Sequence, residues 1–141
     1  MRKEKRWVWY CDFCKKSGCS GGHISHHEKR CTMNPDRHCG MCAMDDDIEQ
    51  VPMPGLLAVL PDVTDCWTEN RYGRSFMVPD SFKEAFSNLR EKVENCPACL
   101  LAALRQKGIP VGAVEGFNFK QECDSWWGTF NEEQRDRGYG Y

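Results

Sequence analysis

The chain has no long hydrophobic run and no large excess of charge of one sign. Its longest apolar candidate, residues 55–60, is far shorter than the roughly 18 apolar residues that a membrane span requires. The opening segment MRKEKRWVWY lacks the apolar stretch of a secretory signal peptide. These absences predict a soluble protein in a reducing cytoplasm.

Cysteine, by contrast, is abundant. Ten of the 141 residues are cysteines, too many to leave unexplained. An extracellular disulfide framework and intracellular metal ligation are the two candidate reasons, and the absence of a signal peptide favours metal. Six of the ten cysteines form C-x2-C pairs, namely Cys11/Cys14, Cys39/Cys42 and Cys96/Cys99.

The first candidate metal site has the spacing C-x2-C-x12-H-x3-C. Its four proposed ligands are Cys11, Cys14, His27 and Cys31. This spacing supplies two zinc ligands from a tight knuckle and two from successive turns of one helix, predicted over residues 22–30. Ile24 supports the assignment, because Ile24, His27 and Cys31 recur at i, i+3 and i+7 on one helical face.

The choice of histidine ligand has alternatives. His26 in place of His27 gives spacings of eleven and four, which also lie within the permitted range. The offset from Ile24 favours His27. We expect His23 and His38 to be surface residues, with His38 a reserve ligand because it adjoins Cys39.

The second candidate site joins Cys39 and Cys42 to Cys96 and Cys99. The first pair resembles a zinc knuckle, and the second pair opens a predicted helix whose dipole favours thiolates. The 53 residues between Cys42 and Cys96 are many more than the usual 15 to 20 or so of a zinc ribbon. The entropic cost of closing a loop, however, rises only with the logarithm of its length, so a treble-clef-like site is still predicted here. With one zinc ion in each site, the chain is predicted to bind two.

Two enzymatic readings compete with structural zinc. Cys96-Pro-Ala-Cys99 has the spacing of a redox dithiol, but no strand–helix–strand context precedes it. His26 and Glu28 together with Cys96 and Cys99 reproduce the H-x-E and C-x2-C elements of a zinc-dependent nucleobase deaminase. That pattern also needs a proline before the first cysteine, where Asn95 stands here, and it would leave Cys11, Cys14 and Cys31 unused. We therefore expect no enzymatic activity.

The predicted fold is small and mainly α, with a zinc-stabilised α+β (ββα-like) finger and a helical body. We divide the chain into a finger region with the first knuckle of the second site (1–43), an irregular connection marked by Asp45 to Asp47 and by prolines (44–78), a helical body (79–133) and a flexible tail (134–141).

Within this scheme, residues 7–10 are expected to form a strand and residues 55–60 a short helical turn, whereas residues 62–78 fit no pattern well. One body helix begins near residues 79–81 and another at Cys96, ending at Gly108. A last helix over residues 118–133 is expected to bury its apolar residues, namely Phe119, Cys123, Trp126, Trp127 and Phe130.

Charge is divided unevenly along the chain. Residues 1–43 hold nine Lys/Arg against four Asp/Glu, whereas residues 44–141 hold ten against seventeen. A basic finger beside an acidic body suits an anionic partner such as nucleic acid, although two solvated faces of opposite sign would look the same. The residues proposed to contact nucleic acid are Lys15, Lys16, Lys29, Arg30, His23 and His26.

The stretch CDFCKKSGCSGGHISHHEKRCTMNPDRHCGMC, with CPACLLAALRQ downstream, resembles small zinc-finger proteins of tailed bacteriophages and prophages. The finger itself is similar to the three-cysteine, one-histidine variant of the Cys-Cys-His-His superfamily, whose helix can enter the DNA major groove. The resemblance implies an accessory protein in the host cytoplasm and places Ser20, His23 and His26 at the base-reading positions. These are poor readers of bases, so we expect contacts mainly to phosphate.

Two functions therefore remain open. In the first, a non-enzymatic zinc-binding accessory protein contacts nucleic acid through its basic finger. In the second, zinc stabilises a small module that binds another protein, such as a host factor, through its acidic body.

Overall fold

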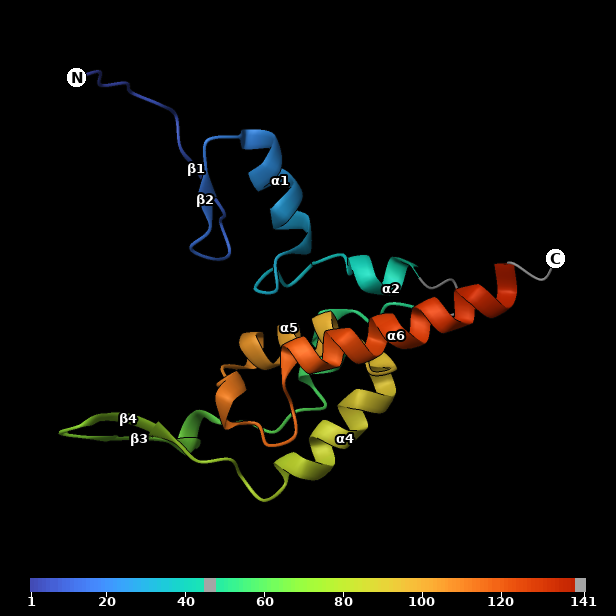
Figure 1. The fold of residues 1–141 in the computed structure, drawn as a ribbon. Helices are drawn as coiled ribbons and strands as arrows, with labels where there is room; N and C mark the ends of the chain where they lie inside the picture. Colours follow the sequence, from blue (N-terminus) through green and yellow to red (C-terminus); the bar gives the residue numbers. More distant parts are fainter. Residues whose placement is uncertain (45–47, 139–141) are drawn as a thin grey trace.

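The computed structural model describes residues 1–44 and 48–138, and residues 45–47 and 139–141 lie outside the description. The first part of the chain is a ββα finger, formed by β1 (Trp9–Tyr10), β2 (Ser17–Gly18) and α1 (Gly21–Arg30) (Figure 1). The strands pair antiparallel, with Trp9 opposite Gly18. The Ser20 side chain caps α1 by accepting a hydrogen bond from the His23 N–H.

The second part is a helical body with one hairpin. Its elements are α2 (Gly40–Met44), α3 (Met53–Leu57), a 3₁₀ turn η1 (Thr64–Cys66), β3 (Trp67–Asn70), β4 (Gly73–Phe76), α4 (Phe82–Val93), α5 (Pro97–Lys107), a second turn η2 (Val111–Ala113) and α6 (Phe119–Gly138). The prediction of a small, mainly helical α+β fold is confirmed at this level.

Helix α5 is the centre of the body. It contacts α3, α4, α6 and η2, and its five consecutive residues from Leu100 to Leu104 are all buried. A helix that is apolar on every side is stable in water only when other elements surround it. Gly108, with a φ of 80°, ends α5 in the left-handed conformation that glycine adopts without strain.

The segment that follows the finger helix is hydrogen-bonded to α5. The Gln106 amide donates hydrogen bonds to the carbonyls of Thr32 (2.7 Å) and Asn34 (2.9 Å). Asn34 is itself buried, and its amide donates to the Glu28 carbonyl near the end of α1 (2.7 Å). These bonds hold the finger against the body rather than leaving it on a free tether.

Three expectations need correction. The predicted helical turn at residues 55–60 is α3, which begins earlier, at Met53, and ends at Leu57. The connection predicted to be irregular also contains the antiparallel hairpin β3–β4. Helix α6 continues to Gly138, beyond residue 133 where the last helix was predicted to end. The remaining tail residues, like Asp45 to Asp47, lie outside the described part of the chain.

The predicted burial of α6 was also wrong. Phe119 and Trp127 are exposed at 38% and 37%, and Cys123, Trp126 and Phe130 are only half-buried. In Figure 1 the carboxy-terminal end of α6 extends beyond the other helices of the body. Trp126, Trp127 and Phe130, near the middle of α6, contact one another, with Trp126 stacked on Phe130 at 5.3 Å between ring centroids.

Candidate metal centres

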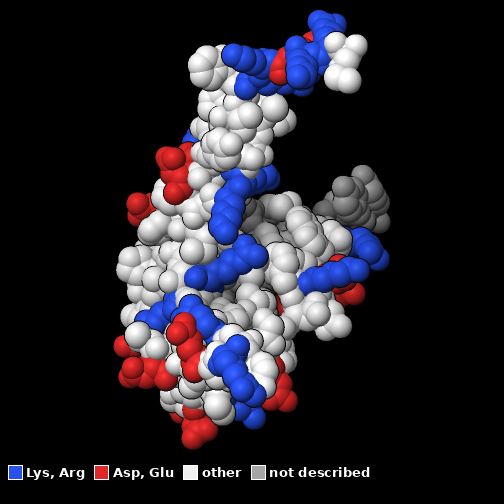
Figure 2. Space-filling view, turned by 90° about the vertical axis from the view of Figure 1, so that its left-hand side faces the viewer, with Lys and Arg blue, Asp and Glu red and all other residues white. Residues whose placement is uncertain are grey.

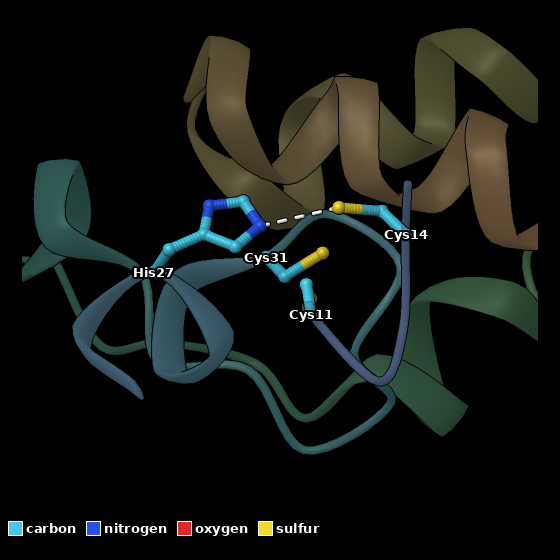
Figure 3. A group of neighbouring side chains, drawn as sticks. All are labelled: Cys11, Cys14, His27 and Cys31. Carbon is cyan, nitrogen blue, oxygen red and sulfur yellow. Dashed lines mark hydrogen bonds between the residues drawn. The ribbon is translucent and has the colours of Figure 1, made fainter. Parts of the chain in front are cut away.

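The first metal centre lies between the finger hairpin and helix α1. Cys11 and Cys14 come from the loop between β1 and β2, and His27 and Cys31 come from the last turn of α1 and the residue after it. Figure 3 shows the four side chains converging, with Nε2 of His27 3.2 Å from Sγ of Cys14. The four donor atoms all lie within 4.8 Å of one another, so this group could hold a metal ion.

Backbone N–H groups in and just after the Cys11–Cys14 knuckle donate hydrogen bonds to its two sulfurs. The N–H groups of Phe13 and Lys16 each donate to a sulfur, the first to Cys11 and the second to Cys14, both at 3.4 Å. The bond from Lys16 is the main reason that the pKa of Cys14 is lowered. Burial raises the pKa of Cys31 to about 11. In the absence of a cation, the group therefore holds some of its sulfurs as thiols.

The finger has almost no hydrophobic core apart from these ligands. Its buried cluster consists of Cys11, Cys31 and Ile24, with Cys14 packed against them. Ile24 is thus the only buried member that is not a proposed ligand, and burying one such side chain contributes roughly 1.5–3 kcal/mol. Conformational entropy opposes the ordering of every residue in the finger, so Ile24 alone cannot hold it folded.

The second metal centre is buried in the body. Sγ of Cys39 lies 3.5 Å from Sγ of Cys96, and Sγ of Cys42 lies 3.5 Å from Sγ of Cys99. All four donor atoms again lie within 4.8 Å of one another. The cysteines are at most 3% exposed, and they belong to the main core cluster.

The structure shows how a 53-residue insertion can separate the two pairs. Cys39 directly precedes α2, and Cys96 directly precedes α5. Between α4 and α5 the chain turns through Glu94 and Asn95, both with left-handed φ values of 52° and 58°, which places Cys96 at the start of α5. The intervening helices pack around α5, so the hydrophobic core brings the distant pairs together. Cys39-Gly40-Met41-Cys42, predicted as a zinc knuckle, runs into the short helix α2, and the Cys42 N–H donates to Sγ of Cys39 at 3.4 Å.

The four cysteines of this centre shift one another's pKa values. The pKa of Cys39 is lowered, mainly because the Cys42 thiol donates a hydrogen bond to its thiolate. The same bond is the main reason that the pKa of Cys42 is raised. Four thiolates so close together would repel one another, and a bound divalent cation removes that repulsion by charge neutralisation.

A buried arginine accompanies the second centre. Arg37 is only 7% exposed, its Nη1 donates to Sγ of Cys99 at 3.8 Å, and its Nε has no hydrogen-bond partner. No carboxylate of the described residues forms an ion pair with it. Gln50 bridges the same region, because its Oε1 accepts from the Cys39 N–H and its amide donates to the Arg37 carbonyl. Among the described residues, the contact of Arg37 with a group that can carry negative charge is therefore the one with the Cys99 sulfur.

Arg37 and Gln50 were not among the site residues predicted from the sequence. Arg37 precedes Cys39 by two residues, but nothing in its sequence context signals burial. Between the finger and Arg37 the chain makes a tight turn, in which the Asn34 side chain accepts a hydrogen bond from the Asp36 N–H at 2.9 Å.

Among the described residues, the alternative histidine ligands, His26 and His38, lie outside both groups of potential metal ligands. Cys96 and Cys99 are grouped with two further cysteines rather than with His26, so the arrangement that a deaminase requires is not formed. None of the ten cysteines forms a disulfide.

Four of the six residues proposed to contact nucleic acid line one hollow on the finger. They are Lys16, His23, His26 and Arg30, while Lys15 and Lys29 are exposed but lie outside the lining. The hollow measures about 730 Å³ and has no acidic residue in its lining. Figure 2 shows Lys and Arg side chains on the amino-terminal arm and in a broken band down the middle of this face, with acidic side chains mainly toward its edges.

Comparisons of the chain with protein-family models, with curated proteins and with solved structures found no match. None of the described helices combines the length and the apolar character that crossing a membrane demands. The two metal centres and the basic hollow are therefore the features from which a function can be inferred.

Proposed function

We propose that both centres bind zinc and that zinc has a structural role in each. Thiolate and imidazole donors in sets of four suit the tetrahedral coordination of zinc. The first centre then resembles a Cys-Cys-His-Cys finger. The second is treble-clef-like, with α5 supplying two of its four ligands. A closed set of four protein ligands leaves no open position for a substrate or a water molecule, so we propose that the protein acts by binding rather than by catalysis.

We further propose that the finger contacts nucleic acid, mainly through the phosphate backbone. The observation that supports this most is the hollow beside α1, which Lys16, His23, His26 and Arg30 line and whose lining contains no acidic residue. Such a surface attracts phosphate groups by charge, without regard to base sequence. The position of the hollow on the finger also agrees with the +5 balance of residues 1–43.

The residues at the start of α1 favour contacts to the phosphate backbone of nucleic acid over contacts to its bases. The Ser20 hydroxyl, at one of the three base-reading positions, accepts the His23 N–H as the helix cap. The remaining two positions hold histidines rather than the Arg, Asn or Gln that read bases with paired hydrogen bonds. We therefore propose weak, sequence-tolerant binding, in keeping with a phage-derived accessory protein of the host cytoplasm.

A second candidate function is the binding of a host protein by the acidic body. The partly exposed cluster of Trp126, Trp127 and Phe130 on α6 favours it, because aromatic side chains are enriched where proteins meet. In this case the zinc ions stabilise a scaffold and the finger is not the contact surface.

Binding to labelled DNA and RNA at two salt concentrations tests the proposal. The wild-type protein should bind at low salt and lose affinity as salt rises. The variant Lys16→Gln/Arg30→Gln should bind more weakly and show a salt slope reduced by about two, since each phosphate contact contributes roughly one unit.

The matched control is Lys83→Gln/Lys120→Gln, which removes two exposed charges from the body. It should bind like the wild type. Absence of any salt-sensitive binding, or equal weakening by both double variants, would refute contact through the finger.

A further inference from the structure

The amino-terminal edge of the finger exposes an unusual number of aromatic rings. Trp7 is 82% exposed, Tyr10 67% and Phe13 40%. None of the ring–ring contacts found among the described residues involves them; those contacts all lie in the body. Large aromatic rings exposed together on a small protein commonly mark a binding surface.

Trp7 and Tyr10, the most exposed of these rings, contribute little to the packing of the finger. Trp9, 44% exposed, is partly covered, because its indole lies against the start of α1, where a Cβ added to Gly21 would be 3.1 Å from the ring. Side chains of neighbouring strand residues point to opposite faces. Tyr10 therefore lies on the face of β1 opposite Trp9, away from α1, and its ring is left for solvent or a ligand.

Positive charge surrounds the exposed rings. Residues 1–16 contain six Lys/Arg, namely Arg2, Lys3, Lys5, Arg6, Lys15 and Lys16, against two acidic residues, Glu4 and Asp12. The six basic residues are all exposed, and Figure 2 shows the arm as the most continuous group of basic side chains on this face. The edge thus combines aromatic faces with the charge that attracts a polyanion.

We propose that this edge binds single-stranded nucleic acid, with Trp7 and Tyr10 stacking on unpaired bases while the basic residues contact the phosphates. The proposal builds on the proposed binding of nucleic acid by the finger and specifies its form. Bases in a duplex are already stacked on one another inside the helix, so their faces cannot reach an aromatic side chain. Unpaired bases offer a free face whatever their identity, which makes such stacking tolerant of sequence.

Fluorescence polarisation with a labelled 15-nucleotide oligo(dT), a 15-nucleotide oligo(U) and a 15-base-pair duplex tests this proposal on the whole 141-residue chain loaded with zinc. The wild type should bind at least one single strand about tenfold more tightly than the duplex. Trp7→Ala/Tyr10→Ala should lose about tenfold or more of its single-strand affinity, as loss of stacking aromatics does elsewhere. Its duplex affinity should stay within about twofold, as expected for contacts to phosphate alone.

Two further variants separate stacking from folding. Trp7→Phe/Tyr10→Phe keeps aromatic faces and should retain most single-strand affinity. Phe119→Ala/Trp127→Ala removes two exposed rings from the body and should change nothing. Equal binding of single strand and duplex by the wild type, or wild-type single-strand affinity in Trp7→Ala/Tyr10→Ala, would overturn the stacking proposal while leaving phosphate contact intact. If the wild type binds none of the three probes, nucleic-acid binding itself is refuted.

Discussion

Replacement of Arg37 by methionine should weaken metal binding at the second centre without weakening it at the first. Arg37 is buried, and its guanidinium contacts Sγ of Cys99 at 3.8 Å. Four thiolates and one divalent cation carry a net charge of −2, and the guanidinium offsets part of it. Methionine keeps a similar length and an apolar stem but removes the positive charge.

The size of the effect follows from this distance. Two opposite unit charges 3.8 Å apart attract by about 4 kcal/mol at an effective dielectric constant near 20. The cost of burying the guanidinium offsets much of this, and hydrogen bonds to charged groups contribute about 1.5–3 kcal/mol net. The expected loss of metal affinity is therefore about 10- to 100-fold, the range typical of outer-sphere partners of metal ligands.

Competition for zinc with a chromophoric chelator measures both centres in one titration. In Arg37→Met the ion of the second centre should be released at a lower chelator concentration than in the wild type, while the ion of the finger is released as in the wild type. Arg71→Met, which removes an exposed arginine from the hairpin turn, is the control and should match the wild type. Affinities within twofold of the wild type at both centres would refute the role assigned to Arg37.

Three other changes have definite expected outcomes. Cys42→Ser should lower the metal content from two ions to one by elemental analysis, whereas Cys66→Ser, outside both ligand groups, should leave it at two. Leu104→Ala removes a fully buried side chain from α5 and should lower the free energy of unfolding in urea by about 2–5 kcal/mol; a loss under 1 kcal/mol would contradict the central place of α5. Gln106→Ala removes two hydrogen bonds to the segment that follows the finger helix and should cost about 1–3 kcal/mol while increasing finger motion in NMR relaxation; unchanged relaxation would mean that other contacts hold the finger in place.

Sequence spacing predicted the local parts of the molecule well. The ligands of the finger lie within 21 residues, where knuckle and helix geometry leave few arrangements, and the structure brings all four together. The helices α4 and α5 were also predictable, because apolar spacing marks α4 and because Gly108 ends α5. In both cases the signal is contained within a few turns of chain.

Features that depend on distant contacts were harder to predict. The hairpin β3–β4 has mostly exposed side chains, so its sequence lacks the alternation of apolar and polar residues that marks a half-buried strand. The apolar residues of α6 follow a helical spacing, but spacing does not reveal whether another element lies over them. Burial of Arg37 likewise depends on where Cys99 is placed, 62 residues further along the chain.

Metal removal tests the central claim most directly, namely that two structural zinc ions hold this chain in its fold. Elemental analysis of the purified protein should find two zinc ions per chain. A strong chelator added under reducing conditions should abolish the cooperative thermal transition seen by circular dichroism, and added zinc should restore it. A chain that binds fewer than two ions, or that melts at the same temperature with and without the chelator, would contradict the claim.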